Sequence, residues 1–273
     1  MGDNRRDARI HLAAAVAGRV RVAPQGTERV DVWWLEPLIT VCVLGLFVLY
    51  TTWAMVFGTG TAGHFAYYAD PYLSPFYSPC VTTNCPQDTF PVIPWAFSPA
   101  WLIFYFPLAF RLTCYYYRKA YYRSFFWAPP ACAVPDAAKR YSGETRFPFI
   151  IQNIHRYAFW GAMLILFFLW WDAVKAFMYQ GHFFVGVGSF VLLANVILLS
   201  LYSFSCHSCR HLAGGYLDVL SGRTLRYKAW RLVSKLNEHH MLIAWCSLVG
   251  VMLTDLYVRL VANSVIPDFH VVF

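Results

Sequence analysis

Cysteine and histidine residues, which bind soft and borderline metal ions, gather in three short segments of the sequence. Cys206 and Cys209 stand three residues apart and share one face of a helix, so both sulfurs can reach a single ion. His155 lies in a second segment, and His239 and His240 lie in a third. Two Cys with two His form the ligand set of a tetrahedral zinc site. They also form that of a Rieske-type 2Fe-2S centre, in which the two Cys hold one iron and the two His hold the other.

The elements expected to position these residues are helices that cross a membrane. Of the 273 residues, 59% are hydrophobic and only 13% are charged, which is about half the charged fraction of a soluble domain and too little to cover a surface in water. Several apolar runs approach or exceed the ~20 residues that cross a bilayer. We therefore predict an all-α integral membrane protein with about five transmembrane helices. The predicted spans are residues 34–57, 95–117, 149–176, 183–206 and 238–262.

Two connections between the spans are informative. Only Met178 to His182 separate the third span from the fourth, which predicts a tight turn between antiparallel neighbours. Pro99 and Pro107 interrupt the second span and must kink it or shorten the part that crosses the membrane.

The distribution of Lys and Arg predicts the orientation, because these residues are concentrated on the cytoplasmic side of membrane proteins. All of the 22 except Lys175 and Arg259 precede the first span or flank the cytoplasmic ends of the other four. Residues 1–33 are therefore expected to form a basic cytoplasmic arm, and residues 263–273 a short outer tail, on either side of a membrane domain of residues 34–262. The net charge of +8 then reflects topology and attraction to anionic lipid, and it does not indicate nucleic-acid binding.

This topology brings the candidate ligands to one depth. His155 lies at the cytoplasmic end of the third span, Cys206 and Cys209 at that of the fourth, and His240 at the start of the fifth. Such residues are costly near a membrane and are functional candidates by default. We predict that Cys206, Cys209, His155 and His240 bind one metal centre. The reserve ligands are His239, His207 and His211.

Plainer interpretations of these cysteines remain open. Structural zinc or unligated thiols would also explain the cluster, because cytoplasmic thiols near arginine are ordinary. Isolated cysteines inside spans are expected to fill packing space. These are Cys42, Cys114 and Cys246.

Two segments outside the spans have further features. Cys80 and Cys85 lie close together in the outer segment, where oxidising surroundings favour a disulfide between them. The cytoplasmic loop of residues 118–146 mixes bases with aromatic residues, which suits an interfacial belt or a docking surface for a partner.

A five-span anchor with its N-terminus inside and redox-type ligands at the cytoplasmic surface resembles the membrane-anchor subunit of succinate dehydrogenases and fumarate reductases. More narrowly, it resembles the actinobacterial, mycobacterial-type succinate dehydrogenase anchor. The resemblance covers residues 34–262, and its sharpest residues are His155 and the runs 206–211 and 238–240. It implies a subunit of succinate:quinone oxidoreductase in the bacterial plasma membrane, which is no enzyme alone. The expected partners are a flavoprotein subunit that oxidises succinate, an iron-sulfur subunit that passes electrons on, and a menaquinone or ubiquinone that receives them.

The sequence departs from the dihaem members of that family. Those members use four His on transmembrane helices to hold two b haems, whereas the first two spans here contain no His. A Rieske-type 2Fe-2S centre in the place of an inner haem is therefore preferred. A single b haem held by His155 and His240 is the alternative, in which Cys206 and Cys209 would be idle. Residues predicted to bind quinone at this depth are Arg156, Tyr157, His207, Arg210 and Trp230.

A function of a different class is a zinc-stabilised membrane scaffold or transporter without redox chemistry. Transporters place polar or broken helix segments near the middle of the membrane. The charged residues Asp172, Lys175 and Asp255 lie near the outer ends of their spans, which weakens the transport interpretation.

Overall fold

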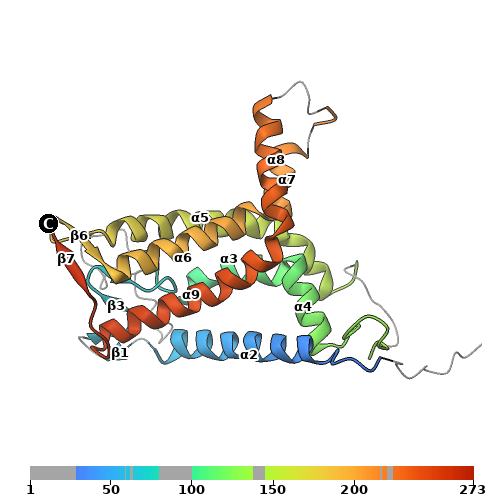
Figure 1. The fold of residues 1–273 in the computed structure, drawn as a ribbon, viewed down its shortest axis with the longest axis horizontal. Coiled ribbons are helices and arrows are strands. Elements are labelled where there is room, and N and C mark those ends of the chain that lie inside the picture. The colour runs from blue at the N-terminus through green and yellow to red at the C-terminus, as the bar shows by residue number, and fades with distance from the viewer. Residues whose placement is uncertain are drawn as a thin grey trace, which may run out of the picture.

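Four long apolar helices run side by side along the length of the molecule (Figure 1). They are α2 (Leu35–Val56), α5 (His155–Lys175), α6 (Val187–Phe204) and α9 (His240–Ala262). The computed structural model describes residues 29–58, 60–61, 64–79, 100–137, 145–215, 217–219 and 224–273. Within these ranges, four helices are long and apolar enough to cross a membrane. A shorter apolar helix, Ile103–Thr113, is the main part of α3. The predicted mostly helical membrane fold is confirmed.

The outer faces of the bundle are apolar. On α2, Leu46, Val48 and Leu49 have exposed side chains, which is the arrangement expected where hydrocarbon chains solvate the protein. The inner faces pack on one another around a core that includes Phe47, Tyr202 and Leu248. A membrane helix needs no polar outer face, so the exposed leucines mark the surface that faces lipid.

The second predicted span is broken. Helix α3 (Ala100–Thr113) has 14 residues, or about 21 Å at 1.5 Å per residue, less than the ~30 Å of a hydrocarbon core. It continues through Pro107, and Cys114 then adopts an extended backbone and caps α4 (Tyr115–Phe125). The interruption predicted from proline is thus present as a shortened helix, but the break lies at Cys114.

A β-hairpin joins α5 to α6 at the end of the bundle that is predicted to lie outside, called the outer end below. Strands β5 (Met178–Tyr179) and β6 (His182–Gly186) pair antiparallel, and Gln180 and Gly181 turn between them with positive φ. This confirms the predicted tight turn between antiparallel neighbours, although α6 begins at Val187 because residues 182–186 form a strand. Strand β7 (His270–Val272) adds to β6, with Gly186 opposite His270, so the C-terminal tail is tied to the same end.

The segment after α2, which is predicted to lie outside, forms two short hairpins. Strand β1 (Gly60–Thr61) pairs with β2 (His64–Phe65), and β3 (Tyr68–Ala69) pairs with β4 (Tyr72–Leu73). Cys80 and Cys85 lie outside the described residues, as does most of the predicted N-terminal arm.

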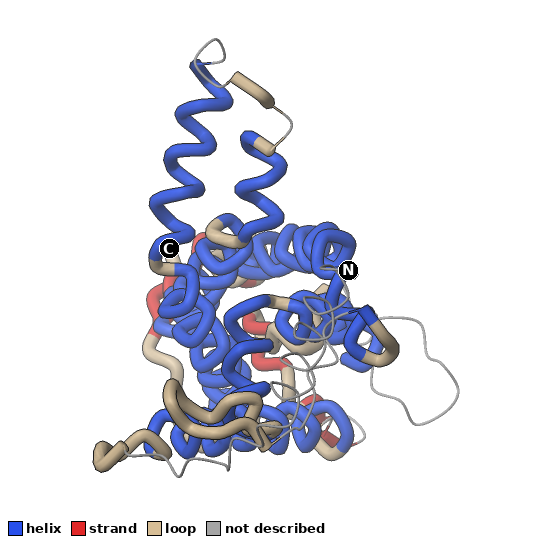
Figure 2. The backbone as a smooth tube through the Cα atoms, turned by 90° about the vertical axis from the view of Figure 1, so that its right-hand side faces the viewer, coloured by secondary structure: helices blue, strands red, loops and turns tan. Residues whose placement is uncertain are grey.

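The opposite end of the bundle carries a helical hairpin that runs across the direction of the long helices (Figures 1 and 2). Its helices are α7 (His207–Gly214) and α8 (Thr224–Glu238). At this same end, the 3₁₀ turn η2 (Phe149–Ile154) leads into α5.

Candidate functional site

Three helix junctions meet at the end of the bundle that carries the helical hairpin of α7 and α8. His155 is the first residue of α5, His240 is the first residue of α9, and Cys206 caps the N-terminus of α7 directly after α6. The structure thus brings the segments of the predicted ligands to one end of the molecule.

Each imidazole is held through its Nδ1 atom by a hydroxyl group. Thr113 Oγ1 lies 2.8 Å from Nδ1 of His155, and Ser205 Oγ lies 2.6 Å from Nδ1 of His240. Both hydroxyls also donate to backbone carbonyls of the preceding turn, Thr113 to Ala109 at 2.7 Å and Ser205 to Tyr202 at 3.1 Å. Because each hydroxyl has one proton, the pattern favours imidazoles that donate from Nδ1 and keep a lone pair on Nε2.

The Nε2 atom of His240 faces a cysteine that the sequence interpretation assigned to packing. Cys114 Sγ lies 3.6 Å from this nitrogen, and its side chain is buried. Cys114 sits at the break between α3 and α4, which puts it at the end of the bundle and not inside a span. The change from an apolar run to Tyr-Tyr-Tyr-Arg-Lys just after it was the available signal for a break at this point.

The predicted cysteine pair occupies the first turn of α7. Cys206 is buried, and its Sγ accepts a hydrogen bond from the backbone N–H of Cys209 at 3.3 Å. Burial raises the pKa of the Cys206 thiol to about 12 and also raises the pKa of the Cys209 thiol. Both sulfurs are therefore protonated at neutral pH unless a bound cation displaces the proton.

Aromatic rings separate the two candidate imidazoles. Phe110 stacks on His155 with centroids 4.8 Å apart, Tyr202 stacks on His240 at 5.2 Å, and the two aromatic rings contact each other at 5.2 Å. Among the described residues, no three Cys, His, Asp or Glu side chains converge in an arrangement that could hold a metal ion. The predicted four ligands thus share one end of the fold without forming a closed ligand shell.

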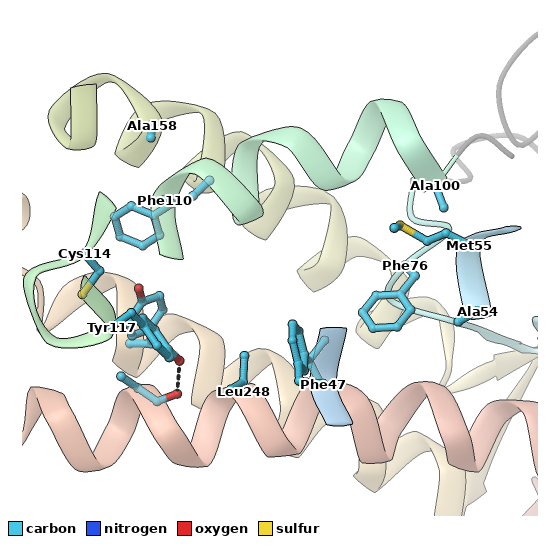
Figure 3. Close-up of a cluster of buried hydrophobic side chains, with 14 of the residues drawn as sticks. Phe47, Ala54, Met55, Phe76, Ala100, Phe110, Cys114, Tyr117, Ala158 and Leu248 are labelled. Carbon is cyan, nitrogen blue, oxygen red and sulfur yellow. Dashed lines mark hydrogen bonds between the residues drawn. The ribbon is translucent and has the colours of Figure 1, made fainter. Parts of the chain in front are cut away.

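Next to these rings lies a cavity of about 980 Å³ that is lined mostly by apolar side chains. Figure 3 shows Phe47, Phe76, Phe110, Tyr117 and Leu248 around this part of the core. The polar groups of its lining come from the hairpin end of the bundle, namely the last turns of α3 and α6, α4 and η2. They are Arg111, Tyr117, Tyr121, Gln152, Tyr202 and Ser203.

Arg111 is the cation of this cavity. Its guanidinium donates to Tyr117 Oη and, at 3.3 Å, to Ser247 Oγ, and it lies 4.7 Å from the centre of the Tyr202 ring. No ion pair within the described ranges includes Arg111. Two polar atoms of the same lining, Tyr202 Oη and Gln152 Oε1, are buried without a hydrogen-bond partner among the described residues. The cavity therefore offers a positive charge and unused hydrogen-bonding capacity at one end.

None of the five residues predicted to bind quinone lines this cavity. Arg156 and Tyr157 start α5 with exposed side chains, and His207 is also exposed. Arg210 lies over the ring of Trp230 at 5.4 Å and donates to Ser234 Oγ, so both residues belong to the hairpin. The reserve ligand His239 is exposed, and His211 is half-buried in α7. Sequence interpretation missed Arg111, because its charge was counted only as a topology signal.

Relatives of this chain are found among known proteins. A profile described as "Actinobacterial succinate dehydrogenase subunit SdhC" matches residues 35–264. A chain of the solved structure "Mycobacterium smegmatis Sdh1 complex in the apo form" is 48% identical with a TM-score of 0.81, over 89% of this chain and 92% of that chain. No curated protein matches the sequence. The chain therefore belongs to the SdhC subunit family of actinobacterial succinate dehydrogenases, which confirms the resemblance drawn from its spans and ligands.

Proposed function

We propose that this chain anchors the flavoprotein and iron-sulfur subunits of succinate dehydrogenase at the cytoplasmic membrane surface and passes their electrons to membrane quinone. The proposed electron carrier is a Rieske-type 2Fe-2S centre at the ends of α5, α6 and α9. Its ligands would be the predicted set, Cys206, Cys209, His155 and His240. When bound, such a centre takes up and releases single electrons at a potential raised by its His ligands.

The state of the two imidazoles is the observation that carries this proposal. Metal-binding His residues are usually fixed through the other ring nitrogen by a hydrogen bond. His155 and His240 have this pairing at Nδ1, through Thr113 and Ser205, and each keeps Nε2 for a ligand. The donor chemistry of this end of the bundle therefore fits a centre with mixed Cys and His ligation, although side chains must turn to close around it.

Two features of the thiols also fit. Hydrogen bonds to the sulfurs of an iron-sulfur centre help to set its reduction potential. Cys206 Sγ already accepts one from the backbone. Cys114, buried beside Nε2 of His240, supplies a third thiol at this end. Because Cys209 is only half-buried, Cys114 is the best replacement for it in the ligand set.

A b haem held by His155 and His240 is less well supported. A haem would need a flat slot between the two imidazoles, but the rings of Phe110 and Tyr202 stack on their faces. The cavity large enough for such a group is lined by neither His155 nor His240. The haem remains the second candidate for this end of the bundle.

The cavity suits the head and part of the tail of a membrane quinone. Ligand sites are typically apolar with a few convergent polar groups, and here Arg111 and Tyr202 provide donors while long apolar walls extend toward the outer end. In this arrangement Arg111 would stabilise negative charge on a quinone oxygen, and Tyr202 Oη would donate to it. Arg156 and Tyr157, exposed at the start of α5, stay the predicted residues along the approach from lipid.

The test of the redox centre is analysis of iron, acid-labile sulfide and haem in the purified complex, with electron paramagnetic resonance. A reduced signal of low average g that is lost in Cys206→Ser supports the proposal, with Cys246→Ser, whose thiol is exposed on α9, as the matched control. Parallel loss in Cys114→Ser but not Cys209→Ser would identify the second sulfur. A pyridine-haem spectrum, with no acid-labile sulfide beyond that of the iron-sulfur subunit, would replace the centre by haem.

The same preparation tests the zinc scaffold or transporter alternative. An iron-sulfur centre or a haem absorbs visible light, whereas zinc does not. A complex that contains zinc, with no iron and no visible absorbance beyond those of its flavoprotein and iron-sulfur subunits, would overturn the proposed electron transfer.

A further inference from the structure

The hairpin of α7 and α8 lies across the ends of the spans. Figure 1 shows it running across the direction of α5, α6 and α9, and Figure 2, which looks along these helices, shows it extending sideways beyond the bundle. If the spans cross the membrane, the hairpin runs parallel to the membrane plane.

The base of the hairpin lies at the boundary of the hydrocarbon. Helix α8 ends at Glu238, and α9 begins at His240. Met241 and Leu242 follow at once with exposed side chains, at 51% and 62%, and such residues on a membrane span face lipid. With 23 residues, α9 is about 35 Å long and only slightly exceeds a ~30 Å core, so its first turn lies close to the headgroups.

Helix α8 presents two different exposed stripes. Leu225, Ala229 and Leu232 are exposed at a spacing of four and three residues, which places them on one apolar side. Lys228, Arg231 and Lys235 are exposed at a spacing of three and four and form a basic stripe beside it. They belong to no ion pair formed between described residues.

Packing against α7 fixes the direction of these stripes. Arg226 donates to the carbonyls of Leu212 and Ala213 at the end of α7, both at 3.1 Å. The ring of Trp230 packs where Gly214 has no side chain, since a Cβ there would lie 2.7 Å from Trp230 Cδ1. The hairpin is therefore a folded unit that holds its apolar and basic stripes outward.

We propose that this hairpin is an interfacial element that binds anionic phospholipids of the cytoplasmic leaflet. The leucine stripe of α8 enters the boundary between headgroups and acyl chains, and Lys228, Arg231 and Lys235 bind lipid phosphates. An apolar stripe flanked by Lys and Arg on a helix in the membrane plane is the pattern of interfacial helices. A soluble partner subunit would bury the leucines against protein instead, and the test separates these outcomes.

Native mass spectrometry measures how much phosphatidylglycerol stays bound to the intact complex. The complex is released from phosphatidylcholine nanodiscs prepared with and without phosphatidylglycerol. Lys228→Gln, Arg231→Gln and Lys235→Gln are combined in one variant and compared with the charge-keeping variant Lys228→Arg, Arg231→Lys and Lys235→Arg. Each Lys or Arg near an anionic membrane surface strengthens binding to that surface by a factor of about five. We expect the neutral variant to retain several-fold less phosphatidylglycerol and the charge-keeping variant to retain the normal amount. Equal retention in both variants would overturn the proposal.

Photo-crosslinking identifies what covers the leucine stripe. Benzoylphenylalanine replaces Leu232, which is 62% exposed, in the complex in the same nanodiscs. Lipid adducts support the interfacial position, and adducts to the iron-sulfur subunit show that the stripe is a protein interface. The electron paramagnetic resonance signal is recorded in every variant, so that loss of the redox centre is recognised separately from loss of lipid.

Discussion

The ring of Tyr202 lies parallel to the imidazole of His240, with centroids 5.2 Å apart and planes inclined by 11°. Tyr202 also contacts Arg111, whose guanidinium carbon lies 4.7 Å from the centre of the Tyr202 ring. Tyr202 thus touches both the candidate redox ligand and the cation of the cavity. In the proposed electron transfer, a single aromatic side chain would separate the imidazole of His240 from the quinone position beside Arg111.

Tyr202→Phe separates quinone binding from packing. The variant keeps the stacked ring but removes the hydroxyl, which is buried without a partner among the described residues. A hydrogen bond is worth about 0.5–1.5 kcal/mol, so we expect the KM for quinone to rise about two- to tenfold while thermal stability stays equal or increases. Steady-state kinetics with a short-chain quinone measure the effect, and Ser200→Ala on the same helix is the control. An unchanged KM would place the quinone elsewhere.

Ser205→Ala tests the fixing of His240. The substitution removes the hydroxyl 2.6 Å from Nδ1 of His240 and leaves the proposed ligand atom in place. Loss of such a partner typically costs 10- to 100-fold in metal affinity or activity. We expect a weaker or shifted electron paramagnetic resonance signal in the complex. Ser208→Ala, a buried serine in the next turn, should leave the signal unchanged; equal signals in both variants would contradict the proposed role.

Loss of one member of the buried ion pair on α9 should strongly lower the stability of the complex. Asp255 and Arg259 pair at 2.7 Å on α9, and Tyr50 and Ser74 donate to the same carboxylate. Removing one member of a buried pair leaves an uncompensated charge and costs about 3–5 kcal/mol. Arg259→Gln should therefore lower the melting temperature of the complex strongly. The double variant Arg259→Gln with Asp255→Asn should lose less than the sum of the single variants, and strict additivity would show that the pair is not coupled.

Gly188 makes room for the Tyr72 ring where α6 begins. A Cβ at Gly188 would lie 2.5 Å from ring atoms of Tyr72, whose hydroxyl donates to Asp268 at 2.7 Å. Gly188→Ala should destabilise the complex because backbone or ring must move. Gly45→Ala on α2 is the matched control, since nothing lies within 4 Å of its Cβ position, and it should be neutral or stabilising by up to ~1 kcal/mol. Thermal unfolding compares the two, and equal melting temperatures would show that Tyr72 adapts freely.

Hydropathy and charge were sufficient to predict where most helices lie, because a bilayer imposes a minimum apolar length on each crossing. The same reasoning located His155 and His240 at adjoining helix ends. It could not find the break at Cys114, since a proline seven residues earlier was the stronger local signal and α3 continues through it. It also missed the strand before α6, because residues 183–186 are apolar and the strand is completed by pairing with the distant C-terminal strand β7 as well as with β5.

The cavity residues were beyond sequence interpretation for a different reason. Arg111 follows an apolar run and reads as the charge that ends a span, yet Tyr117 and Ser247 turn its guanidinium inward. That placement depends on contacts between α3, α4 and α9, which no local pattern encodes.

The position of His155, Cys206 and His240 at a single end of the bundle has an energetic consequence. Moving one charge through a membrane potential of 100 mV costs about 2.3 kcal/mol. Electrons delivered at this end, and protons taken from the adjoining water, would reach a quinone head beside Arg111 without traversing the field. Under the proposed function, succinate oxidation through this subunit would be electroneutral, and its rate in sealed vesicles should not respond to an imposed voltage.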